Sequence, residues 1–184
     1  MLVLNFNPFP QISTQRLLLR AVSPSDANEI IAIRSNKETM KYIDRPLTVS
    51  TEDALQLIKK IIDHAAANEA ITWAITLQNN NSLIGTIGFW KIDKEHHRAE
   101  IGYLLHSGHH QKGIMQEALS AVLDFGFTNM QLHSVEANIN PANEASKKLL
   151  EKNKFIQEAY FKENFFYNGK FLDSVIYSLL APVQ

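Results

Sequence analysis

Three apolar stretches with a period of two lie close together in the middle of the chain, and they constrain the fold more than any other feature. They span Ile71–Leu77, Leu83–Ile92 and Ala99–Leu105. A period of two indicates β-strands, because successive side chains of a strand point to opposite faces. Only short polar turns, Asn79–Asn81 and Asp93–Glu95, separate the three. Connections this short join antiparallel neighbours, so the sequence predicts an antiparallel meander.

Two helices and one strand are predicted before the meander. An extended lead-in over residues 1–15 is followed by a strand at Arg16–Ala21. The segment Ser23–Asp26 is typical of a helix start, and Ala27–Ser35 carries apolar residues at helical spacing. A second helix with one apolar face begins at Thr51.

The elements after the meander alternate between helix and strand before a final hairpin. They are a helix at Gln116–Phe127, a strand at Ser134–Ile139, a helix at Asn143–Lys152, and strands at Phe155–Phe166 and Lys170–Leu180 joined at Asn168-Gly169. The order is β-αα-βββ-α-β-α-ββ, without internal repeats or linkers. It predicts one α+β domain over residues 1–184, with a mixed, mostly antiparallel sheet of about seven strands flanked by four helices.

Composition excludes several classes of protein. The 184 residues carry a net charge of −1, which gives no reason to expect a nucleic-acid or membrane partner. The absence of Cys excludes disulfides and cysteine acyl-enzymes. Adjacent histidines at His96-His97 and His109-His110 lack the spacing of a zinc site, so no metal is expected. The N-terminus lacks the pattern of a signal peptide, and we expect a cytoplasmic monomer or homodimer.

The loop from His106 to Met115 lies between the last strand of the meander and a helix. A helix start presents main-chain N–H groups without partners in the helix, and together with the helix dipole they favour an anion. Gly113 lets the main chain approach a bulky anion, and Lys112 adds positive charge. The pattern favours a pyrophosphate site; the alternative is an ordinary strand–turn–helix joint. It matches neither the nucleotide P-loop nor the dinucleotide-binding glycine pattern.

Several local patterns, in the same order over nearly the whole chain, resemble one family. They are Phe9–Arg20, Ala99–Tyr103, His106–Met115, Asn138–Phe155, and Asn168–Lys170 with Asp173 and Tyr177. In this order they resemble the opening strand, fourth strand, pyrophosphate loop, fifth strand with its following helix, and closing hairpin of the RimJ/RimL-like branch of the GNAT acetyltransferases. That branch includes the ribosomal-protein-alanine N-acetyltransferases. The resemblance implies a GNAT-like fold with acetyl-CoA as co-substrate.

The resemblance also implies a donor site, with three departures in its loop. The family pattern is Arg or Gln, two residues, Gly, one residue, then Gly or Ala; here those positions are His110, Gly113 and Met115. Gln111 stands where this branch commonly has Gly. Main-chain N–H groups form most of the cradle, so we expect binding to survive. The residues implied in acetyl-CoA binding are Leu104, Leu105, His106, His110, Gln111, Lys112, Gly113, Ile114, Met115, Asn138 and Asn143.

Transfer to an amine requires a base, because most of an N-terminal or lysine amine is protonated at neutral pH. We expect Glu100 to accept that proton, directly or through a water. Its neighbours in sequence are apolar, so partial desolvation would raise its pKa toward a useful range. The alternative is a structural ion pair of Glu100 with Arg98 or Lys91.

Ser146 resembles the family residue whose hydroxyl is proposed to bind the leaving thiolate, and Asn143 the residue that binds the pantetheine arm. The main chain of Leu104–His106 is then the expected contact for the arm and the oxyanion. The alternative is that Asn140 or Asn143 caps the helix and Ser146 only packs. Since no Cys is present, direct attack in a ternary complex is expected.

The acceptor is left open by the fold. The resemblance favours a protein or peptide N-terminus; a polyamine, an antibiotic amine, and a catalytically silent acyl-CoA-binding module are the alternatives. Substrate choice is expected to depend on residues 36–50 and on the hairpin around residues 161–171. Tyr42, Phe166 and Tyr167 are the expected walls of an acceptor slot.

Overall fold

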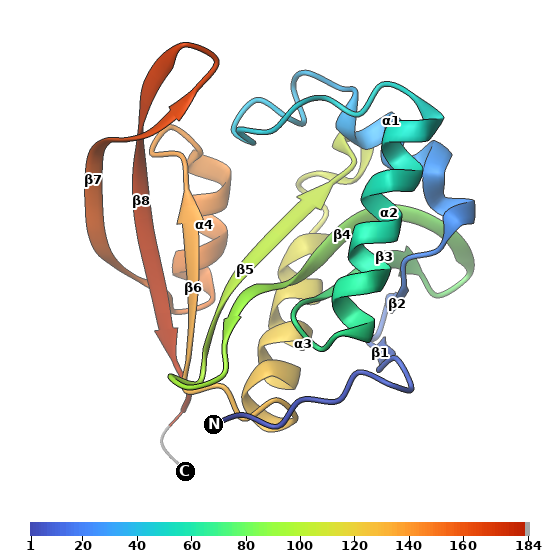
Figure 1. The fold of residues 1–184 in the computed structure, drawn as a ribbon, viewed down its shortest axis with the longest axis horizontal. Coiled ribbons are helices and arrows are strands. Elements are labelled where there is room, and N and C mark those ends of the chain that lie inside the picture. The colour runs from blue at the N-terminus through green and yellow to red at the C-terminus, as the bar shows by residue number, and fades with distance from the viewer. Residues whose placement is uncertain (183–184) are drawn as a thin grey trace.

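A single sheet of eight strands organises the computed structural model, which describes residues 1–182 (Figure 1). The strand order is β1-β2-β3-β4-β5-β6-β8-β7, and every neighbouring pair is antiparallel except β5 and β6. The strands are β1 (Ile12–Ser13), β2 (Leu17–Ala21), β3 (Ile71–Leu77), β4 (Asn80–Asp93), β5 (Arg98–Leu105), β6 (Ser134–Ile139), β7 (Ile156–Tyr167) and β8 (Lys170–Leu180). The predicted α+β class and mostly antiparallel sheet are confirmed.

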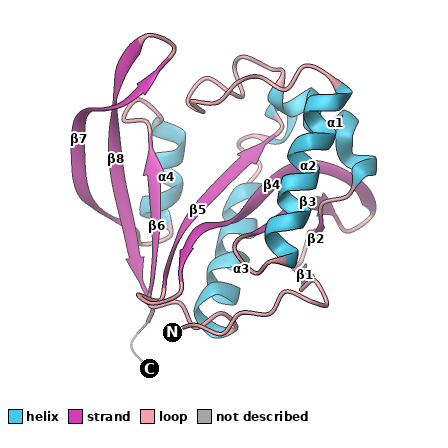
Figure 2. Cartoon of the chain, viewed as in Figure 1, coloured by secondary structure: helices cyan, strands magenta, loops and turns pink. Residues whose placement is uncertain are grey.

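Four α-helices cover the two faces of the sheet, α1 and α2 on one and α3 and α4 on the other (Figures 1 and 2). Residues of α1 and α2 form a small core over β3 and β4, whereas α3 packs into the larger core around Trp73 and Phe89. No helix within residues 1–182 combines the length and the apolar character that crossing a membrane requires. The helices are α1 (Ala27–Arg34), α2 (Thr51–Ala66), α3 (Ile114–Thr128) and α4 (Glu144–Lys152), with 3-10 turns η1 (Pro24–Asp26) and η2 (Ser107–His109).

Two predicted boundaries were wrong, and one strand was not predicted. The turn between β3 and β4 is only Gln78-Asn79, because Leu77 pairs directly with Asn80 and two exposed asparagines therefore join the strand. Helix α3 begins at Ile114, two residues before the predicted start. Strand β1 is only two residues long, too short to leave a periodic pattern.

Strands β5 and β6 pair over three residues and then separate (Figure 1). Arg98–Glu100 is in parallel register with Ser134–Glu136. Beyond that point β5 continues beside β4 and β6 beside β8. Within residues 1–182, the β6-facing edge of Ile101–Leu105 therefore has no strand partner.

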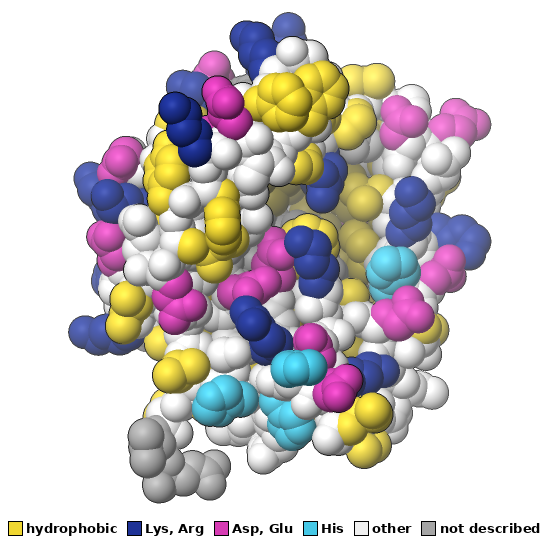
Figure 3. Space-filling model, turned by 60° about the vertical axis from the view of Figure 1, so that its left-hand side comes forward, with side chains coloured by type: hydrophobic (Ala, Val, Ile, Leu, Met, Phe, Trp, Pro, Cys, Tyr) yellow, Lys and Arg dark blue, Asp and Glu magenta, His cyan; other side chains and the backbone are white. Residues whose placement is uncertain are grey.

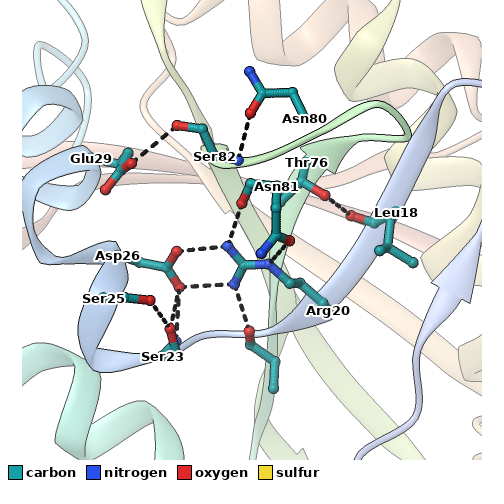
Figure 4. Close-up of polar contacts among 11 residues, drawn as sticks. Leu18, Arg20, Ser23, Ser25, Asp26, Glu29, Thr76, Asn80, Asn81 and Ser82 are labelled. Atoms are coloured by element: carbon teal, nitrogen blue, oxygen red, sulfur yellow. Dashed lines mark hydrogen bonds and ion pairs between the residues drawn. The ribbon is translucent and has the colours of Figure 1, made fainter.

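A buried ion pair fixes the start of α1 against the sheet (Figure 4). Arg20 Nη2 lies 2.7 Å from Asp26 Oδ1, and Arg20 Nη1 lies 2.9 Å from Oδ2. Arg20 Nε also donates to Asn81 Oδ1 at 2.7 Å, which ties the start of β4 to the same cluster. Burial opposes the charge of Asp26, yet hydrogen bonds from Arg20 and Ser23 leave its pKa lowered. The pair thus anchors a helix that forms one wall of the cleft described next.

Candidate active site

A cleft of about 690 Å³ lies on the α1/α2 face of the sheet, beside the gap between β5 and β6. Helices α1 and α2 with their connecting loop form one wall, β3–β5 the floor, and β6 with the β7–β8 hairpin the other wall. Figure 3 shows a hollow with hydrophobic side chains inside it and Lys and Arg side chains around it.

Two aromatic side chains line opposite walls of this cleft. Tyr42 is one of them, as predicted, but the other is Phe165. The prediction of Phe166 and Tyr167 as walls was wrong. Phe166 lies on the opposite face of β7 and packs against Phe171, and Tyr167 lies farther along the hairpin, stacked on Phe165.

Glu100 lies on the floor of the cleft at the point where β5 and β6 separate, and it is only 4% exposed. Its Oε2 accepts a hydrogen bond from Lys91 Nζ at 2.7 Å. Its Oε1 has no partner among the described residues, but it retains contact with solvent. Burial raises the pKa of Glu100; Lys91 opposes that shift without cancelling it, and the neighbouring Glu136 adds to it. The expected ion pair with Lys91 and the expected rise of the pKa are both present, and the role of Glu100 as a base stays a prediction.

A second pair of polar side chains joins β5 to α4 on the other face of the sheet. The hydroxyl oxygens of Tyr103 and Ser146 lie 2.6 Å apart. Ser146 is buried, and burial raises the pKa of Tyr103 to about 12. Sequence reasoning missed Tyr103; its odd spacing from Glu100 on one strand was the available signal, since odd spacing points a side chain to the opposite face.

Asn143 caps helix α4. Its Oδ1 accepts the main-chain N–H of Ser146 at 3.1 Å, so the capping interpretation is confirmed for this residue. Its side-chain amide nitrogen has no partner within residues 1–182. The cap also fixes the first turn of α4, and with it the position of Ser146.

The loop before α3 presents a run of free main-chain donors. Among the described residues, none of the N–H groups from Gln111 to Gln116 donates a hydrogen bond to the protein. Gly113 forms the N-cap of α3 in the left-handed region, with φ of +72°. Arg16 supports the loop from outside, through Nη1 to the Lys112 carbonyl at 2.9 Å and Nε to Glu117 Oε2 at 2.6 Å. Six consecutive donors at a helix start fit a bulky anion such as a pyrophosphate.

Two side chains of this loop form hydrogen bonds with main-chain carbonyl groups, one at the end of β5 and one within the loop. His110 Nε2 lies 2.9 Å from the carbonyl oxygen of Leu105 at the end of β5. Lys112 Nζ donates to the Gly108 carbonyl at 2.7 Å, which keeps its charge beside the free N–H groups. Gln111, at the position where the related branch commonly has Gly, adopts a φ of +59°.

Comparison with known proteins identifies the family. Residues 16–156 match the acetyltransferase (GNAT) domain. The chain belongs to the GNAT acetyltransferase family. GNAT acetyltransferases bind acetyl-CoA and an amine acceptor. The structure of this GNAT protein has two candidate binding regions, the cleft and the loop before α3, and they lie on different sides of β5.

Relatives of this GNAT protein differ in their named acceptors. It is 34% identical to the uncharacterized N-acetyltransferase YoaA of Bacillus subtilis over 95% of this chain and 98% of the relative. It is 27% identical to a spermidine N(1)-acetyltransferase of Vibrio cholerae over 86% and 89%. A GNAT-family acetyltransferase structure from Bacillus anthracis matches with a TM-score of 0.83, at 29% identity over 94% and 99%. Solved RimL and RimJ proteins share the fold.

The predicted site residues of this GNAT protein divide between two sides of β5. Glu100, Leu104 and Asn138 line the cleft. The loop ending at Met115, and Asn143 with Ser146, belong to the α3 and α4 side. Leu105 and His106 end β5 between the two groups. The roles of these residues stay predictions.

Proposed function

We propose that this protein transfers the acetyl group of acetyl-CoA to a primary amine, at a protein or peptide N-terminus, by direct attack in a ternary complex. The position of Glu100 carries the proposal. A buried carboxylate with a raised pKa and one open oxygen lies on the cleft floor, beside the gap between β5 and β6. A group of this kind can take a proton from an amine near neutral pH. A cytoplasmic location belongs to the same proposal.

The chemistry divides between the two faces of the sheet. Glu100 accepts the amine proton at Oε1, directly or through a water, while Lys91 holds Oε2. The nitrogen forms a bond to the thioester carbon, and the carbon–sulfur bond breaks. A main-chain N–H of the unpaired β5 edge stabilises the oxyanion. Ser146 donates a hydrogen bond to the leaving sulfur.

Tyr103 orients Ser146 for that task. A phenol is the stronger acid and an aliphatic hydroxyl the better acceptor, which favours Tyr103 as the donor of their 2.6 Å hydrogen bond. The hydrogen of Ser146 is then free to point toward the sulfur. With its pKa near 12, the phenol remains protonated throughout the working pH range.

The α3 loop is the proposed site of the donor's pyrophosphate, held by the free N–H groups and by Lys112. The pantetheine arm lies along the unpaired edge of Ile101–Leu105, where the Asn143 amide nitrogen is available to it. The residues present fit this group, because the donors lack partners within residues 1–182 and Gly113 adopts the left-handed conformation of the loop without side-chain strain.

The charges in the cleft favour a peptide end over a polyamine. Arg34, Arg45, Lys60 and Lys91 line it against three carboxylates, Asp44, Glu100 and Asp173. A polycation would meet more positive than negative charge there. An α-amine also loses its proton about two pH units below a lysine amine.

A competition assay tests the proposal. A peptide that begins with Ala and contains one internal Lys is mixed with spermidine and acetyl-CoA, and the products are identified by mass spectrometry. We expect acetyl groups on the α-amine, and at least a tenfold slower reaction in Glu100→Gln at neutral pH. Acetylation of the lysine or spermidine alone would refute the N-terminal acceptor. A trapped acetyl-enzyme would refute the ternary complex.

A further inference from the structure

Three cations on one wall of the cleft lie outside every ion pair formed within residues 1–182. Arg34 ends α1, Arg45 lies in the α1–α2 loop, and Lys60 belongs to α2; all three line the cleft. Among residues 1–182, none of the three forms an ion pair with a carboxylate. On the floor, by contrast, Lys91 is paired with Glu100. Cations gathered without a counterion favour an anion in the space beside them.

Arg34 is fixed on one edge of its guanidinium group and open on the other. Its Nε donates to the hydroxyl of the buried Thr48 at 3.2 Å, and its carbonyl oxygen accepts the Thr48 N–H at 3.3 Å. Its two terminal nitrogens have no hydrogen-bond partner among the described residues. Burial, and then repulsion by Arg45, lowers the pKa of Arg34. A fixed fork of free N–H donors is suited to a carboxylate or a phosphate, which it binds through two parallel hydrogen bonds.

None of the three carboxylates that line the cleft serves as the anion bound by Arg34. Glu100 is already paired across the floor, and Asp173 accepts hydrogen bonds from its own hairpin. Asp44 is next to Arg45 in sequence, but burial raises its pKa more than Arg45 lowers it. No ion pair joins Asp44 to Arg34 or Arg45.

The cationic wall lies within electrostatic reach of the proposed base. Burial raises the pKa of Glu100, and Arg45 is close enough to oppose that shift. Arg45 is also the charge that, after burial, lowers the pKa of Arg34. Because Glu100, Arg34 and Arg45 all line the same cleft, one acceptor molecule can place its amine at Glu100 and a negative group beside the two arginines.

We propose that the acceptor carries an anionic group, a carboxylate or a phosphate, within a few bonds of the amine that is acetylated, and that Arg34 and Arg45 bind this group. The inference rests on the proposed function, because it takes Glu100 as the base. It narrows the acceptor to acidic peptide ends and small anionic amines.

Matched acceptors that differ only in the negative group test the inference. One pair is the peptide amides Ala-Asp-Ala-Ala and Ala-Asn-Ala-Ala; the other is phosphoethanolamine and ethanolamine. Steady-state release of CoA gives kcat/KM for each. We expect the acidic member of at least one pair to be favoured about tenfold or more, and the preference to shrink as salt screens the charges. The pair that shows it identifies the source of the anion.

Three variants assign that preference to the arginines. Arg34→Gln and Arg45→Gln should each remove most of this preference, measured as the ratio of kcat/KM for the acidic and neutral members of one pair, while leaving the KM for acetyl-CoA within about twofold. Arg45 is exposed in its loop, so its substitution does not endanger folding. Lys59→Gln removes the same charge from α2 outside the cleft, where Lys59 pairs with Asp63, and should keep the full preference.

The outcomes separate this inference from the proposed function. Equal kcat/KM for both members of each pair, in a protein that acetylates amines, overturns the anion site and leaves the acetyltransferase proposal intact. A preference that survives both arginine variants also overturns it. If no amine is acetylated, the proposed function fails, and calorimetric binding of the acidic and neutral peptides to the CoA-loaded protein decides the anion site without turnover.

Discussion

Glu100 and Lys91 form an ion pair whose partners differ greatly in exposure. The Lys91 side chain is 59% exposed and that of Glu100 only 5%. The carboxylate of Glu100 is therefore buried, whereas the Lys91 side chain that neutralises it is in contact with solvent. Burial raises the pKa of Glu100, and the hydrogen bond and charge of Lys91 limit that rise. We infer that Lys91 tunes the base.

Lys91→Gln should move the acid limb of the kcat/KM profile to higher pH. Removal of the cation takes away the main influence that lowers the pKa of Glu100, so the carboxylate stays protonated over a wider range and activity appears only at higher pH. The measurement is kcat/KM against pH for both proteins, with a peptide acceptor. Lys94→Gln, three positions along the chain in the turn after β4 and outside any ion pair of residues 1–182, should leave the limb in place. A limb that stays fixed or moves to lower pH in Lys91→Gln would contradict the assignment.

Tyr103 and Ser146 should act as one unit. If Tyr103 orients the Ser146 hydroxyl, Tyr103→Phe should lower kcat about tenfold, and Ser146→Ala about 10- to 100-fold. The double variant should be no slower than Ser146→Ala alone, because the serine is then no longer present to be oriented. Tyr177→Phe is the control: this buried residue donates its phenol hydrogen to Gln157 and not to Ser146, so its substitution should leave kcat unchanged. If the double variant instead lowered kcat by the product of the two single factors, the two hydroxyls would act independently.

The loop before α3 holds two residues in the left-handed region, and only one of them is Gly. Gln111 has a φ of +59° and Gly113 a φ of +72°. A side chain in this region costs about 1–2 kcal/mol, whereas Gly adopts it freely but loses more chain entropy on folding. The loop therefore stores a small strain at Gln111 that the related branch commonly avoids with Gly.

Opposite stability changes are expected at these two positions. Gln111→Gly should leave the free energy of unfolding unchanged or raise it by up to about 1 kcal/mol, since relief of strain exceeds the added entropy of the unfolded chain. Gly113→Ala should lower it by about 1 kcal/mol, because a side chain is strained at a φ of +72°, and the distorted loop should bind acetyl-CoA more weakly. Urea unfolding and calorimetry with acetyl-CoA provide the two measurements. The prediction would be contradicted if Gln111→Gly lowered the free energy of unfolding by more than Gly113→Ala does.

Elements with strong local signals were predicted, and weakly patterned ones were not. Helix α2 has a capping box at Ser50 and Asp53 and a regular apolar face, so its start was clear. The hairpin between β7 and β8 turns at Asn168-Gly169, where both residues have positive φ as a tight turn requires. The start of β4 was misplaced because exposed asparagines in a strand look like a turn.

The site was only partly predictable because much of it consists of contacts between distant segments. Glu100 and the α3 loop follow from local sequence, and the pairing of Glu100 with Lys91 was one of two partners considered. The contact between Tyr103 and Ser146 spans 43 positions and depends on how α4 docks on the sheet. Arg34 and Arg45 line the same cleft only because of the path of the irregular loop between α1 and α2, and no periodicity predicts the path of such a loop.

The separation of β5 and β6 has an evolutionary consequence. If the donor is held along this gap and by the α3 loop, its recognition depends on main-chain atoms, which every residue except proline supplies in full. Mutations can then accumulate in these segments while acetyl-CoA binding is inherited, as the Gln111 and Met115 substitutions illustrate. The wall of the cleft presents side chains such as Arg34, so a substitution there changes what the wall can bind. New amine specificities can therefore arise in this lineage by change on one face of the sheet while the other face is conserved in shape.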